Sequence, residues 1–157
     1  GIEFSVQKKS SDIPHYALLS VTYSETKFTP LDGVERKGNY DQKWIVNLSV
    51  GYMLNDNWQI SSKFRFSTGA PYTPFDNYGG QSVLLYNTQT LPDNHSLDIR
   101  VERKWTFESM DLIAYVDIQN IYNRKNRTSV RWDYEKMKIK DESSIGLLPS
   151  IGISLEF

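Results

Sequence analysis

The stretch Leu148-Pro-Ser-Ile-Gly-Ile-Ser-Leu-Glu-Phe157 is the most informative part of this chain for its fold. Its apolar residues Ile151, Ile153 and Leu155 alternate with small or polar ones, which is the period of two that characterises a β-strand. Such a strand has one apolar face and one polar face. This two-faced pattern is typical of a transmembrane β-barrel, whose outer surface meets hydrocarbon and whose lumen is polar.

The same alternation recurs along the chain, and no segment of ten or more residues has the period of a helix. The predicted strands span residues 1–9, 14–27, 43–54, 58–67, 96–105, 110–135 and 148–157. Most of them run to about ten residues, which suits a tilted membrane strand better than the usual soluble strand of about five or six. Asn, Arg and Lys cluster between residues 120 and 126, so we expect the sixth segment to be interrupted there.

The connections between these strands alternate in length. Short turns are predicted at 10–12, 55–57 and 106–109, and long loops at about 27–42, 69–94 and 136–146. The long stretches carry Gly, Pro, Asn and Asp, as loops do. Short turns at one end and long loops at the other are the pattern of an outer-membrane barrel, with periplasmic turns and extracellular loops.

The composition excludes several classes of protein. No run of about 18 apolar residues occurs, which argues against a transmembrane helix. The 18 basic and 19 acidic residues are mixed along the chain, so no patch for nucleic acid is expected. The chain has no cysteine and no hydrolase, zinc-protease or phosphate-loop motif, so we expect no enzyme activity, no cofactor and no metal site.

The odd number of predicted strands bears on how the sheet closes. Bacterial barrels have an even number of strands, about eight at the least, and an open edge in lipid leaves backbone N–H and C=O groups unpaired. We therefore expect residues 1–157 to be the C-terminal part of one larger antiparallel transmembrane β-barrel domain. One alternative is that 110–135 holds two strands of an independent eight-stranded barrel with a structural or adhesive role. A second alternative is a soluble carbohydrate-binding β-sandwich, because its strands also alternate.

Several stretches resemble the late barrel strands of TonB-dependent outer-membrane receptors. They are residues 41–58 (DQKWIVNLSVGYMLNDNW), 67–75 (STGAPYTPF), 91–103 (LPDNHSLDIRVER) and 117–125 (DIQNIYNRK), followed in the same order by the closing strand to Phe157. The resemblance covers most of the chain. It implies an all-β chain in the outer membrane of a Gram-negative bacterium, within a barrel of about 22 strands filled by a plug domain.

The resemblance also implies a role in the uptake of a scarce nutrient with energy from TonB. The plug, the TonB box and the earlier strands lie outside residues 1–157, so this chain would contact TonB only indirectly, through the rest of the receptor. The expected partners are outer-membrane lipid, the remainder of the barrel with its plug, and the barrel-insertion machinery. As in similar outer-membrane proteins, the terminal Phe157 would be part of the assembly signal that this machinery reads.

Two further groups of residues are candidates for function. Charged residues on the polar faces would line the lumen, and we expect them mainly to form ion pairs between neighbouring strands; they are Lys63, Arg65, Asp98, Arg100, Glu102, Lys104 and Asp117. The aromatic residues Tyr72, Phe75 and Tyr78 are candidates for ligand contact, because binding residues concentrate on loops. A packed loop stiffened by two prolines explains the same stretch equally well.

The four tryptophans form a last group. Trp44, Trp58, Trp105 and Trp132 lie near predicted strand ends or beside turns. An amphipathic ring is favoured at the depth of the lipid headgroups, so a girdle at the two membrane interfaces would account for these positions. The alternative is a set of aromatic core residues in a sandwich.

Overall fold

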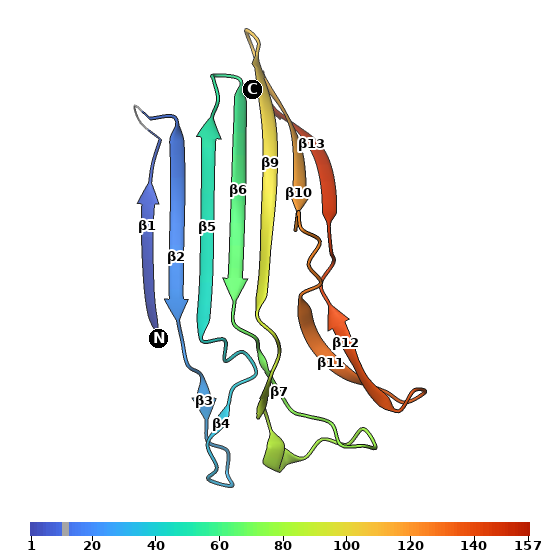
Figure 1. Ribbon diagram of the computed structural model, residues 1–157. Helices are drawn as coiled ribbons and strands as arrows, with labels where there is room; N and C mark the ends of the chain where they lie inside the picture. Colours follow the sequence, from blue (N-terminus) through green and yellow to red (C-terminus); the bar gives the residue numbers. More distant parts are fainter. Residues whose placement is uncertain (11–12) are drawn as a thin grey trace.

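One large antiparallel sheet dominates the computed structural model, which describes residues 1–10 and 13–157 (Figure 1). Seven strands lie side by side in the order β1-β2-β5-β6-β9-β10-β13. They are β1 (Ile2–Lys8), β2 (His15–Tyr23), β5 (Trp44–Met53), β6 (Trp58–Ser67), β9 (Asn94–Thr106), β10 (Asp111–Gln119) and β13 (Leu148–Glu156). The prediction of an all-β fold with a large antiparallel sheet is confirmed.

Three two-stranded ribbons extend from the connections between these strands. They are β3 (Lys27–Phe28) with β4 (Arg36–Lys37), β7 (Pro71–Tyr72) with β8 (Gln89–Thr90), and β11 (Arg127–Asp133) with β12 (Lys138–Ser143). A short 3-10 turn, η1 (Val83–Leu85), lies between β7 and β8. All three ribbons lie at the same end of the sheet, which is the lower end in Figure 1. We call it the loop end.

The opposite end of the sheet, the turn end, carries short connections. Between β5 and β6, the Asn55 side chain accepts hydrogen bonds from the backbone N–H groups of Asn57 and Trp58, both at 2.9 Å. Between β9 and β10, the Phe107 N–H donates to the Met110 carbonyl at 2.9 Å. The turn expected at 10–12 falls largely on residues 11 and 12, which lie outside the described part of the chain.

The strand register places apolar side chains on one face of the sheet, the apolar face. One row of direct partners across five strands reads Tyr52, Ile60, Val101, Val116 and Ile151. The adjacent row, which points to the other side, reads Gly51, Ser61, Arg100, Asp117 and Ser150. We call that side the polar face. A slip of one residue in any strand would exchange the two faces, so this pattern specifies the register strongly.

The apolar face has no covering layer in the described part of the chain. Leu91 is the one large aliphatic or aromatic side chain that is buried there, whereas Ile151 and Ile153 are 83% and 74% exposed. The chain exposes 11018 Å² of surface, against about 8100 Å² expected for a compact chain of its mass. The described residues therefore do not form the two packed sheets of a β-sandwich, which was the second alternative.

The segment 110–135 differs from the prediction. β10 ends at Gln119, and the chain turns through Asn120 and Asn123, both with positive φ (51° and 55°). It then enters β11, which pairs with β12 and not with a strand of the large sheet. The interruption expected at 120–126 is present, but β11 does not join the large sheet, so 110–135 does not supply two strands to it.

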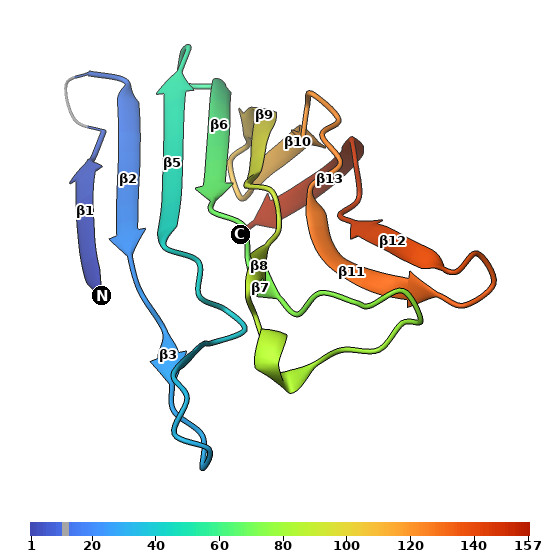
Figure 2. The ribbon, with the colours of Figure 1, turned by 60° about the horizontal axis from the view of Figure 1, so that its bottom comes forward.

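The large sheet is open. Its outer strands β1 and β13 have one partner each, and no sheet closes within residues 1–10 and 13–157. Figure 2 shows the curvature: β9, β10 and β13 turn away from the direction of β1, β2 and β5. The antiparallel all-β class is thus established, while closure into a ring stays a prediction. No helix in the described residues is long and apolar enough to cross a membrane.

Candidate functional site

The seven charged residues that the sequence singled out lie on the polar face, on three adjacent strands. Lys63 and Arg65 are on β6; Asp98, Arg100, Glu102 and Lys104 are on β9; and Asp117 is on β10. The register makes Lys63 the direct partner of Asp98, and Arg100 the direct partner of Asp117. The structure thus brings charges of both signs together across the middle of the sheet.

Two ion pairs involve these residues, one of them with Asp111 of β10 as the partner. The Lys104 ammonium contacts the Asp111 carboxylate across β9 and β10 at 2.5 Å, and Arg100 Nε contacts Glu102 Oε2 along β9 at 3.0 Å. Among the described residues, four of the seven take part in no ion pair, so the expected ladder does not form; they are Lys63, Arg65, Asp98 and Asp117. Partly exposed pairs of this kind contribute about 0–1 kcal/mol each, so these charges shape the electrostatic potential more than the stability.

A hollow of about 570 Å³ lies on the polar face toward the loop end. Its lining is rich in amides and includes Asn47, Arg65, Asn94, Asp98, Gln119 and Asn126. Amide and hydroxyl groups offer both hydrogen-bond donors and acceptors, which suits a polar solute. A smaller hollow of about 320 Å³ adjoins it and is lined by Lys63, Arg100 and Asp117, among others.

Two asparagines that the sequence reasoning treated only as a strand interruption form part of this site. The backbone N–H of Asn120 donates to Asp98 Oδ1 at 2.8 Å, and its side chain donates to the Arg124 carbonyl at 2.8 Å. The Asn126 amide accepts from the His95 N–H at 3.0 Å and donates to the His95 carbonyl at 2.8 Å. These contacts hold the segment after β10 against β9, beside the polar hollow.

His95 lies on the apolar face, as the direct partner of Phe66, and Asp93 directly precedes β9. His95 Nδ1 shares a hydrogen bond of 2.7 Å with the Tyr122 hydroxyl, and Asp93 accepts from the Gly69 N–H at 3.0 Å, so these two side chains have different partners. Within the described part of the chain, no group of three or more His, Cys, Asp or Glu residues is placed to hold a metal ion.

The three loop aromatics lie in different environments. Phe75 packs on Trp132 of β11, with ring centres 6.0 Å apart, and Tyr72 is half-buried in the ribbon of β7 and β8. Tyr78 is 81% exposed. Only Tyr78 therefore presents a whole ring to an approaching ligand, while Phe75 contributes to loop packing.

A carboxylate positions Tyr78 in its loop. Asp76 Oδ1 accepts hydrogen bonds from the backbone N–H groups of Tyr78 at 2.8 Å and Gly80 at 2.7 Å. These bonds favour the ionised carboxylate and hold the pKa of Asp76 below its ordinary value. The turn so formed places Gly79, with φ of 86°, against Trp132.

The first two long loops form one continuous surface. The side-chain amide of Asn87 donates to the Lys37 carbonyl and to Asn39 Oδ1, both at 2.9 Å, and the Tyr86 hydroxyl donates to Asn39 Oδ1 at 2.6 Å. Phe28 and Tyr86 meet edge to face at 5.7 Å. Within the first loop, Arg36 and Asp32 form an ion pair at 2.6 Å, and the guanidinium holds the pKa of that carboxyl below its usual range.

Aromatic residues lie at both ends of the apolar face. At the loop end, Trp44 packs on Tyr23 with ring centres 5.0 Å apart. Trp58 begins β6 and Trp105 lies one residue before the end of β9, both at the turn end. Trp132 does not fit the expected girdle, because it packs in the loops against Phe75 and Gly79. Phe157, directly after β13, is 95% exposed.

Comparison with known proteins identifies no relative: no protein-family model, no curated protein and no solved structure matches this chain. The resemblance to TonB-dependent receptors therefore remains an interpretation of the sequence motifs.

Proposed function

We propose that this chain builds part of the wall of a bacterial outer-membrane β-barrel receptor. The apolar face would meet lipid, and the polar face would line the lumen. The observation that carries the proposal is the apolar face itself, which runs across seven strands and is uncovered in the described residues. Exposed apolar patches beyond a few hundred Å² mark interaction or membrane surfaces, and a lipid bilayer is the partner that can cover a face of this extent.

The lengths of the strands fit this proposal. β5 and β6 have 10 residues each, so at a rise of about 3.3 Å per residue each is about 33 Å long. A tilt of about 40° reduces that length to about 25 Å across the membrane, which is the height of the apolar band in barrels of this class. Trp44 at one end and Trp58 and Trp105 at the other would then lie at the two interfaces.

The edges of the sheet support a larger ring. β1 and β13 each present one row of unpaired backbone N–H and C=O groups. Hydrocarbon cannot form hydrogen bonds with these groups. We infer that further strands pair with both edges and close the barrel. A plug in the lumen would then face Lys63, Arg65, Asp98, Arg100 and Asp117 on the polar face.

The connections support a receptor role. The loop end would be extracellular, with Tyr78 available to a ligand and the amide-rich hollow below it on the path inward. Uptake driven by TonB rests on the sequence resemblance, and the coupling would pass through the plug. In this proposal, Phe157 is read by the insertion machinery during assembly.

The absence of native cysteine makes a direct test practical. Single cysteines at Val46, Asn47, Leu48 and Ser49 would be spin-labelled in the protein in its native membrane or in phospholipid vesicles. Labels at 46 and 48 should collide with oxygen, which concentrates in lipid, and should be shielded from a water-soluble nickel chelate. Labels at 47 and 49 should show low access to oxygen.

Two outcomes would overturn the proposal. If the nickel chelate reaches positions 46 and 48 as readily as it reaches a loop position such as 77, the apolar face meets water. Shielding of 46 and 48 from both reagents would mean that protein, and not lipid, covers this face.

A further inference from the structure

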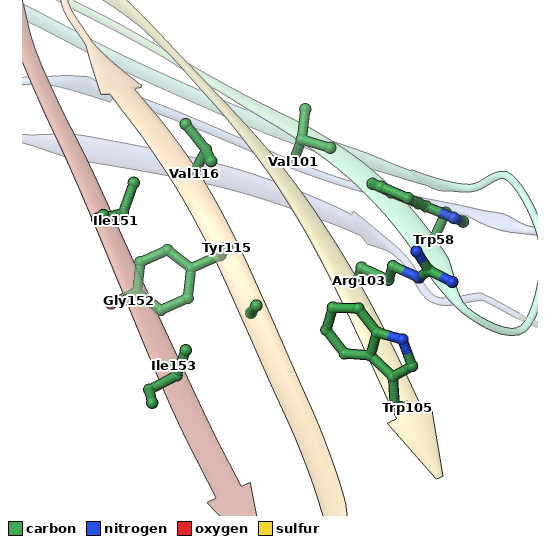
Figure 3. Close-up of a pocket in the computed structure, with 10 residues that line it drawn as sticks. Trp58, Val101, Arg103, Trp105, Tyr115, Val116, Ile151, Gly152 and Ile153 are labelled. Carbon is green, nitrogen blue, oxygen red and sulfur yellow. The ribbon is translucent and has the colours of Figure 1, made fainter.

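One cation lies among aromatic rings on the apolar face. Arg103 of β9 has Trp58 and Ala114 as its direct partners on the two neighbouring strands. Its guanidinium carbon lies 5.2 Å from the ring centre of Trp58 and 4.7 Å from that of Trp105 (Figure 3). Two indole rings thus hold the guanidinium group, which is exposed and forms no ion pair among the described residues.

All the fully charged side chains on the apolar face of the large sheet are cationic. Within the seven strands of the large sheet, the side chains with a full charge on the apolar face are Lys8 and Arg103, both cationic and both near the turn end. Lys8 contacts His15 Nε2 and lies on the outermost strand β1. No carboxylate lies on this face of those strands, so an anion that approaches Arg103 meets no repulsion there.

An apolar hollow of about 620 Å³ adjoins the Arg103 guanidinium. Val101, Val116 and Ile151 line its part toward the middle of the strands, and Trp58 and Trp105 line its part at the turn end (Figure 3). The small side chain of Ala114 separates Arg103 from Ile153 in the register. The site therefore combines one cation at the level of the strand ends with an apolar trough that runs from it toward the middle of the sheet.

We propose that this site binds one anionic phospholipid, with its phosphate on Arg103 and an acyl chain along Val101, Val116 and Ile151. The inference rests on the proposed function, because it requires the apolar face to lie in a membrane. A guanidinium group donates two parallel hydrogen bonds to phosphate. An arginine in the hydrocarbon is costly, but near a strand end it reaches the headgroups, where indole rings are also favoured. The lipid would belong to the leaflet at the turn end.

The test uses the purified protein in detergent, stripped of lipid and titrated with phosphatidylglycerol under native mass spectrometry. The wild-type protein should retain one lipid at low concentration. Arg103→Gln should weaken that first binding step by about tenfold or more, because it removes a charge-assisted contact. Lys8→Gln is the matched control, since it removes the same charge from the same face and should leave the first step unchanged.

Two further arms separate the headgroup from the acyl chain. Ala114→Phe keeps the cation and fills the hollow, so it should also lower the affinity for the lipid. Glycerol phosphate, which has no acyl chain, should not compete with phosphatidylglycerol. Equal losses in Arg103→Gln and Lys8→Gln, or full competition by glycerol phosphate, would overturn the lipid site.

The spin-label and lipid-binding results together separate the lipid site from the proposed membrane-wall function. If spin labels at 46 and 48 meet lipid while Arg103→Gln binds lipid as the wild type does, the wall function stands and the lipid site does not. If those labels meet water or protein, both proposals are wrong.

Discussion

The phenol ring of Tyr115 on β10 lies directly over the backbone of Gly152, its register partner on β13. A methyl group added at Gly152 would overlap the ring. The Arg100 guanidinium carbon lies 3.8 Å from the centre of the same ring, so the contact links three neighbouring strands on the polar face. Tyr16 covers Gly51 in the same way between β2 and β5. An aromatic ring over a cross-strand glycine fixes the register of a sheet.

Gly152→Ala should therefore destabilise the sheet. The new methyl group must displace the Tyr115 ring and with it the contact to Arg100, and overpacking of this kind costs about 1–3 kcal/mol. Urea unfolding in phospholipid vesicles, followed by tryptophan fluorescence, measures the free energy of unfolding. Ser154→Ala is the control, because it changes a small side chain on the same strand and the same face. Equal effects of the two substitutions would mean that the Tyr115 contact has no energetic role.

Gly79→Ala should loosen the loop that presents Tyr78. Gly79 has φ of 86° and lies against Trp132, so a methyl group there meets both backbone strain and the indole ring. In a variant whose remaining tryptophan is Trp132, the emission should shift to the red as the ring becomes hydrated.

Gly33→Ala is the control for backbone strain alone. Gly33 also has positive φ, of 75°, but no atom lies within 4 Å of a methyl group placed there. This substitution should leave the emission of Trp132 unchanged. A red shift of the same size in both variants would mean that the shift does not arise from the contact between residue 79 and Trp132.

Most strands of the large sheet could be predicted from the sequence because their signal is local. Alternation with a period of two assigns each residue to a face, and the turn residues Asn55 and Asn57 mark a reversal. The apolar face, the polar face and the sorting of short turns from long loops follow from the same pattern. Whether the sheet closes depends on which strands pair with its two edges, and the alternation within each strand does not specify that pairing.

Two features escaped the sequence because they depend on contacts between distant segments. Arg127–Asp133 alternates as β10 does, so the pattern alone could not show that it leaves the large sheet. The turn is fixed by Asn120, which bonds to Arg124 and whose N–H bonds to Asp98 on β9. Trp132 was expected at a membrane interface, but its partners Phe75 and Gly79 come from the preceding long loop.

Acid should release the turn at Asp76. Hydrogen bonds from backbone N–H groups hold the pKa of this carboxyl below the ordinary value of 3.8. Because the pKa of Asp76 is lower in the folded state, the ionised carboxylate stabilises the turn at pH values above 3.8. That stabilisation is lost as the pH falls through the pKa of the folded state. A spin label on a cysteine at Asn77 should therefore become mobile only below about pH 3.8.

Asp76→Asn provides the comparison for this titration. The asparagine has no carboxyl to protonate, so the mobility of the label should not change with pH over the same window. A transition of the same midpoint in the Asn variant would assign the effect to another group, such as Asp133 in the neighbouring hairpin, whose pKa is also lowered by backbone N–H donors.

Asn126→Ala should free the segment that follows β10. The Asn126 side chain takes the place of a strand partner for His95, because it accepts from the His95 N–H and donates to the His95 carbonyl. Its removal leaves two backbone groups without these partners, at a cost of about 1–3 kcal/mol for each group that stays buried. Hydrogen exchange at the His95 amide should become faster, while the amides in the middle of β9 should keep their protection.

Thr128→Ala is the matched control for Asn126→Ala. Its hydroxyl donates to the Glu142 carbonyl at 3.2 Å, so its hydrogen-bond partner lies in β12 and not in β9. This variant should leave the exchange at His95 unchanged. If Asn126→Ala also leaves that exchange unchanged, the amide of Asn126 does not hold the segment against β9.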